Sequence, residues 1–373
     1  MQPRDTVICT VGTSLLTNLR TAPASPPANW SVIQSAYQGR EWRRLGRELA
    51  ALDPRDRLCG AEINTLEEIR AKSWIEPRRL IFLVSDTDDG RAMGNVLEAY
   101  CQTRRDLAVQ AHSVVVEGLQ DARPSEFKSR GLRNLVRAIG EQVAKFGADH
   151  VVIDATGGYK AQIALAVVMG QVLSIPVLYK HERFSTIIDF PPLPIAFDYD
   201  FLGKQADLLV AFGRGATLTA SEVGNVDEKL RVLLTEVEID GEMVYELNPI
   251  GAIYLTGYRQ RSSREAPPLK PAQHRKAPTF GKDHHYPSQF KEFVQRVWEE
   301  NEWVQTAHTV PYAGQAGIRK GISFRVEQVD GAPALIGSYK VNDFGARFRL
   351  RLEDEQPPTL AAAAFDLNDR YQL

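Results

Sequence analysis

The sequence predicts an α/β protein that begins with a doubly wound domain built on a parallel sheet. Up to about residue 200, short β-branched runs alternate with amphipathic segments, which is the pattern of βαβ units. Turns rich in glycine and hydroxyl side chains follow two of the expected strands. The chain has 373 residues, enough to bury two or three separate cores. We therefore expect a large α/β domain followed by smaller domains.

Hydrophobic periodicity gives the elements of this first domain, residues 1–197. Strands are expected at residues 6–11, 80–85, 113–116, 150–155, 176–180 and 186–190. Helices, with apolar residues at steps of three and four, are expected at residues 41–52, 92–104, 127–146 and 160–173. Strands that alternate with helices in this way predict a parallel sheet with helices on both faces.

Residues 198–261 change rhythm and predict a winged helix-turn-helix domain. Helical patterns cover residues 204–212 and 219–236, and alternating runs over residues 237–247 surround Asp240 and Gly241, a hairpin signal. Few basic residues lie where DNA would contact such a domain, which favours a spacer or a dimer surface.

Residues 262–283 predict a basic linker punctuated by prolines. Two interpretations remain open for it: a solvated tether, or a segment that contacts RNA phosphates. Residues 284–373 predict a small α+β domain, with a helix at residues 287–302 and strands at residues 322–329, 335–340, 347–353 and 359–365.

Bulk composition limits the possible functions. The formal net charge of −2 excludes a uniformly basic surface, so any RNA contact must be local. The three cysteines, Cys9, Cys59 and Cys101, have irregular spacing that suits neither a disulfide framework nor a metal site, and we expect none. No apolar run approaches the roughly 18 to 20 residues that span a bilayer. We expect a cytoplasmic protein that touches no membrane.

Two loops of the first domain have the composition of phosphate-binding turns. Residues 10–18 read TVGTSLLTN, in which Gly12 permits a sharp turn and hydroxyls and free amides face the sheet edge. Residues 154–160 read DATGGYK, in which two glycines allow close ligand approach and Lys160 supplies a cation. Each loop alone is weak evidence, but together they predict one anion site.

These two loops, with residues 59–62 (CGAE), 85–87 (SDT) and 179–184 (YKHERF), resemble the CRISPR-associated Rossmann-fold (CARF) sensors over residues 5–200. The resemblance implies a homodimer whose twofold axis passes through a cyclic oligoadenylate. An isologous site suits an even-numbered ring, so cyclic tetra-adenylate is our first choice and cyclic hexa-adenylate the second. Some relatives cleave their ligand, and this sequence leaves that open.

By this resemblance, Thr13 and Ser14 donate to phosphate, Lys160 neutralises charge and residues 156–158 supply amides. The expected ligand-binding residues are Gly12, Thr13, Ser14, Leu15, Asn18, Asp86, Thr87, Thr156, Gly157, Gly158 and Lys160. Lys180, His181, Glu182, Glu62 and Asp86 can equally form a local polar network without touching ligand.

Three kinds of effector are known alternatives for the C-terminal domain, since fold does not fix function. A helical ribonuclease with arginine four to six residues before histidine has no match after residue 200. A metal nuclease lacks its carboxylate, because Ser338 stands in that position and Asp330 has no partner. A metal-independent messenger RNA endonuclease remains.

Residues 338–351 (SYKVNDFGARFRLR) resemble the paired central strands of RelE-type toxins, and residues 368–371 (NDRY) resemble the end of that active site. The resemblance covers roughly the last 90 residues. It implies that Lys340, Arg347 and Arg349 stabilise the transition state, that Arg370 grips phosphate and that Tyr371 is the acid or base. Alternation puts residues 347, 349 and 351 on one sheet face, although an ordinary solvated arginine row gives the same pattern.

The sequence departs from that family where Asn342 replaces a second lysine and where the chain ends two residues after Tyr371, without the usual terminal helix. The leading hypothesis is a messenger RNA endoribonuclease that acts in the ribosomal A site and is switched on by cyclic oligoadenylate in type III CRISPR antiviral defence. The alternatives are a non-catalytic regulator that binds DNA or protein, and a sensor that degrades the ring.

Overall fold

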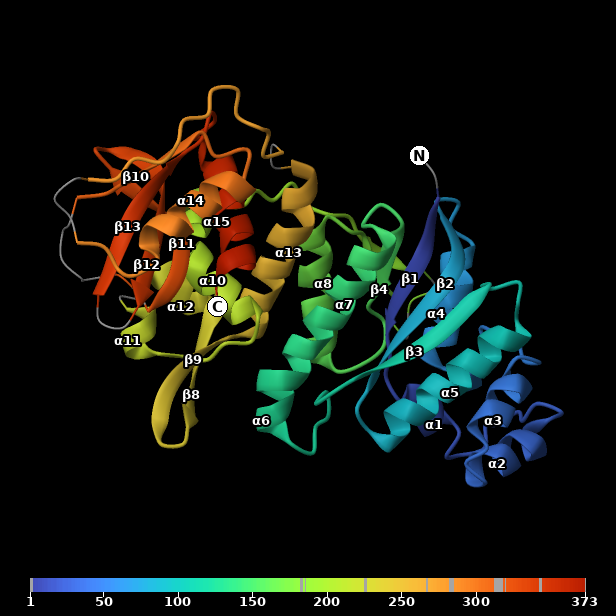
Figure 1. Ribbon diagram of the computed structural model, residues 1–373. Coiled ribbons are helices and arrows are strands. Elements are labelled where there is room, and N and C mark those ends of the chain that lie inside the picture. The colour runs from blue at the N-terminus through green and yellow to red at the C-terminus, as the bar shows by residue number, and fades with distance from the viewer. Residues whose placement is uncertain are drawn as a thin grey trace. The chain divides into compact units, whose positions relative to one another are not determined.

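The computed structural model describes residues 3–181, 184, 186–224, 227–265, 268–281, 285–311, 318, 320–341 and 344–372. The chain divides into two compact units (Figure 1). The N-terminal unit comprises residues 1–195 and 252–257, and the C-terminal unit comprises residues 196–251 and 258–373. No helix in the described ranges is both long enough and apolar enough to cross a bilayer.

The N-terminal unit contains a six-stranded sheet in the order β3-β2-β1-β4-β5-β6. The strands are β1 (Arg4–Thr10), β2 (Ile75–Ser85), β3 (Gln110–Val116), β4 (Val151–Asp154), β5 (Val177–Tyr179) and β6 (Ile188–Phe190). Strands β1 to β5 pair in parallel, and β6 is antiparallel to β5. The predicted parallel α/β sheet is confirmed, and its strand order reverses between β1 and β4, where ligands bind in open α/β sheets.

Helices cover both faces of this sheet (Figure 1). One face carries α1 (Ser14–Asn18), α2 (Trp30–Gln38), α3 (Trp42–Leu49), the short helix Arg57–Cys59, α4 (Gly60–Arg70) and α5 (Asp88–Thr103). The other carries α7 (Leu132–Phe146) and α8 (Lys160–Leu173), with α6 (Pro124–Glu126) and the π-helical turn Phe127–Gly131 leading into α7. Alternation along β1 sends Val7 and Cys9 to the first core and Ile8 to the second.

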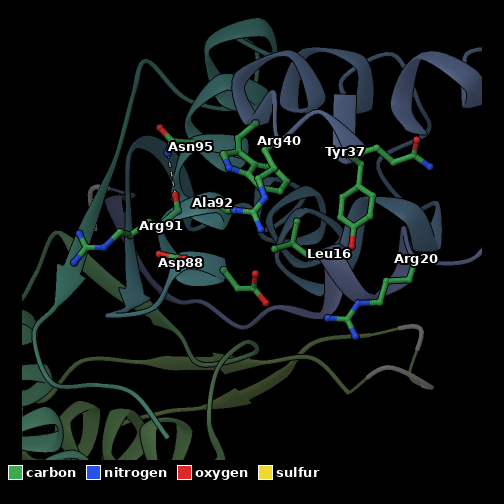
Figure 2. Close-up of a pocket in the computed structure, with 11 residues that line it drawn as sticks. Leu16, Arg20, Tyr37, Arg40, Asp88, Arg91, Ala92 and Asn95 are labelled. Atoms are coloured by element: carbon green, nitrogen blue, oxygen red, sulfur yellow. Dashed lines mark hydrogen bonds between the residues drawn. The ribbon is translucent and has the colours of Figure 1, made fainter. Parts of the chain in front are cut away.

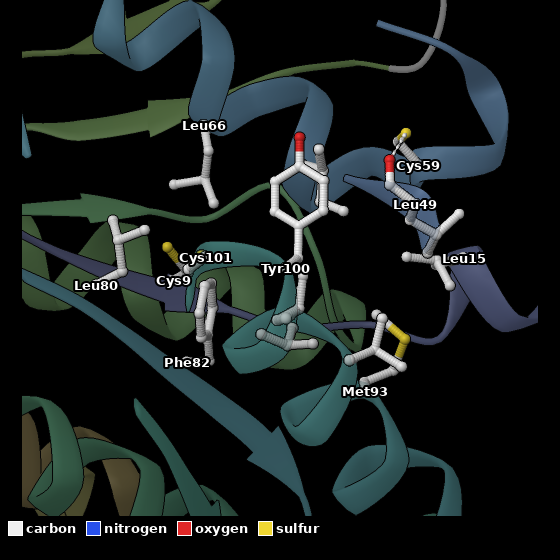
Figure 3. Close-up of a cluster of buried hydrophobic side chains, with 14 of the residues drawn as sticks. Cys9, Leu15, Leu49, Cys59, Leu66, Leu80, Phe82, Met93, Tyr100 and Cys101 are labelled. Carbon is white, nitrogen blue, oxygen red and sulfur yellow. Dashed lines mark hydrogen bonds between the residues drawn. The ribbon is translucent and has the colours of Figure 1, made fainter. Parts of the chain in front are cut away.

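The first of these cores contains all three cysteines of the chain among leucine and aromatic side chains (Figure 3). Cys9, Cys59 and Cys101 are buried and free. Their thiols therefore pack as small apolar groups, and burial raises the pKa of each.

The first part of the C-terminal unit combines short helices with a three-stranded sheet in the order β7-β9-β8. Its elements are α9 (Tyr199–Lys204), α10 (Ala206–Gly213), β7 (Leu218–Thr219), α11 (Ala220–Val223), α12 (Glu228–Leu233), β8 (Leu234–Ile239), β9 (Glu242–Leu247) and α13 (Pro249–Glu265). The predicted hairpin is confirmed: Asp240 and Gly241, with φ of 52° and 82°, join β8 to β9. The predicted long helix over residues 219–236 is wrong, because two short helices and the start of β8 occupy it.

The rest of this unit is a four-stranded antiparallel sheet in the order β10-β13-β12-β11. Its elements are α14 (Phe290–Glu300), β10 (Thr306–Thr309), β11 (Gly321–Val329), β12 (Ala332–Val341), β13 (Phe344–Arg351) and α15 (Pro357–Tyr371). The predicted strand over residues 359–365 is wrong, because this segment lies in α15. Prolines begin that helix and four consecutive alanines, the best helix formers, follow. Tyr371 is therefore the last residue of a helix rather than a residue that follows a strand.

The described part of the expected basic linker is held by backbone hydrogen bonds. Ala272 N–H donates to Glu302 O (3.0 Å), Lys276 N–H to Gln305 O (2.9 Å) and Thr279 N–H to Ala307 O (2.9 Å). The Arg275 guanidinium also lies 4.3 Å from the centre of the Trp298 ring. Residues 272–279 therefore run along α14 and β10 and are no solvated tether; Lys282 lies outside the described residues.

Candidate functional site

The two predicted phosphate loops lie against each other at the carboxyl ends of β1 and β4. These strands pair directly, with Cys9 opposite Asp154. The Thr10 hydroxyl donates to Gly157 O (2.6 Å). A methyl group on Gly12 would lie 2.8 Å from Gly158 N, so the loops pack backbone to backbone and leave no room for side chains there. One rim of the sheet thus carries both loops, as the sequence predicted.

Glu62, in the first turn of α4, lies at the contact between the loops. Its Oε1 accepts a hydrogen bond from Gly12 N–H (2.8 Å), and a methyl group on Gly157 would overlap the same oxygen. The residue is 1% exposed, and no described group donates to its Oε2. Burial raises the pKa of this carboxyl, while the Gly12 amide opposes the rise.

Asp154, at the end of β4, is a second buried carboxyl beneath the loops. Its Oδ1 accepts from the Thr156 hydroxyl (2.6 Å) and from Thr156 N–H (3.1 Å). No described group donates to its buried Oδ2. Burial raises the pKa of Asp154 to about 7, and the negative charge of Glu62 adds to the rise. Two buried carboxyl groups whose ionisation is disfavoured therefore lie beneath the rim.

The predicted ligand residues of the first loop divide into accessible and structural ones. Thr13 is exposed, and the Ser14 hydroxyl is buried without a hydrogen-bond partner among the described residues. Leu15 is fully buried in the core, so only its backbone faces the loop. Asn18 donates to Arg57 O (2.8 Å) and fixes α1 to the segment before α4.

The other predicted ligand residues show the same division. Lys160 is exposed at the start of α8, above the amides of residues 156–158. Asp86 instead accepts from Gly118 N–H (3.1 Å) and pairs with Arg91 (2.6 Å), which ties two loops of the fold together. Thr87 caps α5 by accepting from Gly90 N–H (3.0 Å). Asp86 and Thr87 thus have structural roles, and Lys180 forms an ion pair with Glu68.

Two neighbouring hollows open beside the loops, and both are lined by Asp88 and Asp89. The first is lined by Val11, Gly12, Thr13, Ser85, Thr87, Asp88, Asp89, Asp121, Gly158 and Tyr159. The second, shown in Figure 2, is lined by Leu16, Arg20, Tyr37, Gln38, Arg40, Trp42, Asp88, Asp89, Arg91, Ala92 and Asn95. The second combines two aromatic rings with arginines and carboxylates, a lining that suits a flat polar group better than a bare phosphate.

Comparison with known proteins bears on this rim. Residues 57–193 match a protein family described as "CRISPR-associated protein (Cas_APE2256)". The matched region contains Glu62, Asp154 and the second loop but not the first. A search of the curated proteins found no match.

The solved structures that are similar to the chain include a Can2 complex and protein VC1899. The structure of Can2 from Sulfobacillus thermosulfidooxidans in complex with cyclic tetra-adenylate shares 12% identity and covers 70% of this chain, with a TM-score of 0.27. This chain spans 65% of the Can2 chain, less than two thirds. Protein VC1899 from Vibrio cholerae shares 8% identity, with 93% of this chain and 77% of that one covered and a TM-score of 0.27. Such TM-scores record only a partial similarity of shape.

The C-terminal unit carries the second set of predicted residues on the sheet formed by β10 to β13. Antiparallel pairing places Ser338 opposite Arg347 and Ile336 opposite Arg349, so Lys340 shares a face with both arginines. His308 of β10 lies directly opposite Arg349 and joins that face. We call Lys340, Arg347, Arg349 and His308 the cationic face.

Acidic side chains neutralise part of this face. Arg349 and Arg351 both pair with Glu355 (3.1 and 3.3 Å), and Arg347 shares Glu327 with Arg325 (3.6 and 2.7 Å). Lys340 Nζ donates to Ile318 O (3.3 Å) and has no carboxylate partner in the described ranges. These arginines therefore lie among Glu327 and Glu355, and Arg325 also lies 4.0 Å from Asp207.

Tyr371 and Arg370 do not join the other three predicted catalytic residues. The Tyr371 ring packs 6.1 Å from Phe324 and 5.8 Å from Phe293, on the sheet face opposite to Lys340. Its hydroxyl donates to Glu300 (2.6 Å) and accepts from Asn301 (2.9 Å), and burial and Glu300 raise its pKa to about 12. Arg370 is exposed and pairs with Asp366 (2.9 Å). The five residues therefore form no single site.

Sequence reasoning assigned no role to His308 or Asp154, and it did not indicate the burial of Glu62. His308 was not considered because its register opposite Arg349 is set by strand β10, which the sequence did not predict. Burial lowers its pKa, and the charges of Arg349 and Arg351 lower it further. Glu62 and Asp154 both lie in the motifs quoted from the sequence. The one sequence signal of their burial is that each is a polar residue with apolar neighbours in the chain. In the described ranges, no group of three His, Cys, Asp or Glu side chains is placed to hold a metal ion.

Proposed function

We propose that the N-terminal unit binds a cyclic oligoadenylate across its paired loops, as part of type III CRISPR antiviral defence. The observation that carries the proposal is the direct contact between the Gly12 loop and the Gly157 loop at the switch point of a parallel sheet. The exposed Thr13 hydroxyl, the exposed Lys160 ammonium and the amides that begin α8 are donors for phosphate. The family match of residues 57–193 supports the CRISPR context.

The acidic hollows beside the loops take the bases of the ligand in this proposal. Asp88 and Asp89 repel phosphate, but their carboxylates accept hydrogen bonds from the exocyclic amine of adenine. Tyr37 (Figure 2) and Trp42, which both line the second hollow, offer rings for a base to contact. A homodimer would bring two copies of each loop around an even-numbered ring, for which cyclic tetra-adenylate is the first choice and cyclic hexa-adenylate the second.

We further propose that the C-terminal unit is a metal-independent, ribosome-dependent messenger RNA endoribonuclease. Lys340, Arg347 and Arg349 share one sheet face and would stabilise the charge of a phosphorane. His308 replaces Tyr371 in the proposed acid or base role, because it lies opposite Arg349 and its lowered pKa keeps the imidazole neutral near pH 7. Attack by the 2′-hydroxyl would leave a 2′,3′-cyclic phosphate end.

One observation favours a C-terminal unit without catalytic activity. The ion pairs of Arg347 and Arg349 with Glu327 and Glu355 are those of a structural arginine cluster. In that case the C-terminal unit would be a non-catalytic regulator that binds protein or DNA, with residues 198–261 serving as a winged helix.

Translating ribosomes with a defined messenger RNA test both halves of the proposal. We expect cleavage in the A site only when cyclic tetra-adenylate is added. Lys160→Met should raise the ring concentration required, because an exposed cation contributes about 1 kcal/mol to such binding. Lys128→Met, an exposed lysine in the turn before α7, is the matched control. Ring binding without any cleavage would favour the regulator, and no ring binding would refute the sensor.

A further inference from the structure

The floor of the ring site contains more acid than the fold requires. Glu62 and Asp154 are each 1% exposed, and each has one oxygen without a donor among the described residues. An uncompensated buried carboxylate is costly, whereas an apolar side chain of similar size would fill the space. A role that uses the charge state of these two groups would explain why both are acids.

The groups around this pair are neutral or acidic. Cys9 faces Asp154 and Glu62 from β1, and its own pKa is raised by burial and by both carboxyls. Thr10 and Thr156 contribute hydroxyls, and Gly12 contributes its amide. Lys180 donates its backbone amide to the Thr156 hydroxyl, but its ammonium group pairs with Glu68. In the described ranges no cation forms an ion pair with either carboxyl of the pair.

We propose that Glu62 and Asp154 are positioning residues that couple binding of the ring to the uptake of one proton. This inference rests on the function proposed above. Glu62 holds Gly12 and borders Gly157, so its charge lies directly under the loops that receive phosphate. A polyanion bound there raises the free energy of ionising both carboxyls and so raises their pKa values. The pair therefore takes up a proton when the ring binds.

The coupling has a definite sign. Binding that takes up one proton becomes weaker as the pH rises, because the concentration of free protons falls. The affinity for the ring should fall by at most about tenfold per pH unit where the pair gains one proton on binding. Glu62 and Asp154 thus set both the spacing of the two loops and the pH response of the site.

Calorimetric titration of the full chain with cyclic tetra-adenylate between pH 6 and pH 8.5 tests the inference. Each titration is run in two buffers of different ionisation enthalpy, which counts the protons taken up. Chromatography afterwards confirms that the ligand is intact. We expect uptake approaching one proton per site and an affinity that decreases with pH.

Two variants assign the proton. Asp154→Asn keeps an oxygen that can accept from Thr156, and Glu62→Gln keeps one that can accept from Gly12, so both preserve the loops while removing an acid. Each should bind the ring with an affinity that changes little with pH. Glu76→Gln, an exposed residue of β2 paired with Arg78, should behave like the parent chain.

Each outcome decides something. A parent chain that binds the ring with pH-independent affinity and no proton uptake overturns this inference and leaves the sensor intact. A pH dependence that survives in both variants also overturns it, because another group then carries the proton. Absence of binding at every pH overturns the sensor and this inference together.

Discussion

The rim of the N-terminal sheet and the cationic face of the C-terminal sheet gather their residues in different ways. At the rim, parallel strands end side by side, so the loops after β1 and β4 must meet whatever their side chains do. On the C-terminal sheet, side chains alternate between two faces, and convergence depends on register and on which segments are strands. The first arrangement follows from topology, and the second follows from pairing details.

The two regions also differ in charge. The rim has the buried carboxyls of Glu62 and Asp154 below it and exposed aspartates beside it, and Lys160 lies at its edge. Backbone amides and hydroxyls must therefore supply most of the hydrogen bonds to a bound anion. The cationic face instead presents lysine and arginine side chains, of which Arg347 and Arg349 pair with Glu327 and Glu355. Binding at the rim should therefore depend less on salt than RNA binding at the cationic face does.

The strongest way to break this comparison is to separate the two loops. In Gly157→Ala, the added methyl would lie 2.8 Å from Gly12 N and would overlap Glu62 Oε1. We expect ring binding to weaken by more than about 100-fold and the free energy of unfolding to fall by about 1–3 kcal/mol. Calorimetric titration and chemical denaturation measure the two effects.

Gly39→Ala, in the turn after α2, is the control for Gly157→Ala. The added methyl there would lie no closer than 3.1 Å to its neighbours, and the residue lies outside both loops. Ring binding by this variant should match that of the parent chain. If Gly157→Ala folded and bound the ring equally well, contact between the loops would have no functional importance.

On the cationic face, two substitutions test which of the five predicted catalytic residues act together. Arg349→Met should reduce messenger cleavage about 100-fold, because a fixed cation beside the reacting phosphate is lost. Arg370→Met should change cleavage little, since Arg370 is exposed and pairs only with Asp366 among the contacts described. Gel analysis of cleaved messenger on translating ribosomes measures both. Equal losses in the two variants would restore the five-residue site that the fold separates.

Most of the first domain could be predicted because its elements carry strong periodic signals. Helix α8 has the bounds that the sequence indicated, residues 160–173, and every expected strand of this domain overlaps an observed one. Burial of the second strand on both faces leaves a continuous apolar run that few other structures produce. The contact between the two loops followed from that strand pattern alone.

The C-terminal domain was harder to predict because its signals conflict. Residues 359–365 contain Thr359, Leu360 and Phe365, which suit a strand, but the intervening alanines and the prolines before them favour the helix α15. Tyr371 was placed with Lys340 only by resemblance, and its ring packs on the opposite face of the sheet. The burial of Glu62 and Asp154 under the rim could not be predicted, since burial depends on tertiary packing that no local pattern encodes.

The smallest expected effect is on the pH dependence of the free energy of unfolding. This quantity reports on the acidic rim without any ligand. Asp154 has a pKa of about 7 in the folded chain, above the unfolded value of about 3.9, so the folded state holds a proton that the unfolded state has released. Stability is therefore greatest below the unfolded pKa and declines as the pH rises through the folded one. Between pH 6 and pH 8 the loss should be about 1.4 kcal/mol, and Asp154→Asn should abolish this part of it. Denaturation by urea at each pH measures the change, with Asp106→Asn, an exposed carboxylate, as the control. A parent chain and an Asp154→Asn variant with parallel pH profiles would show that Asp154 is ionised in the folded protein and that the floor of the rim carries a permanent negative charge.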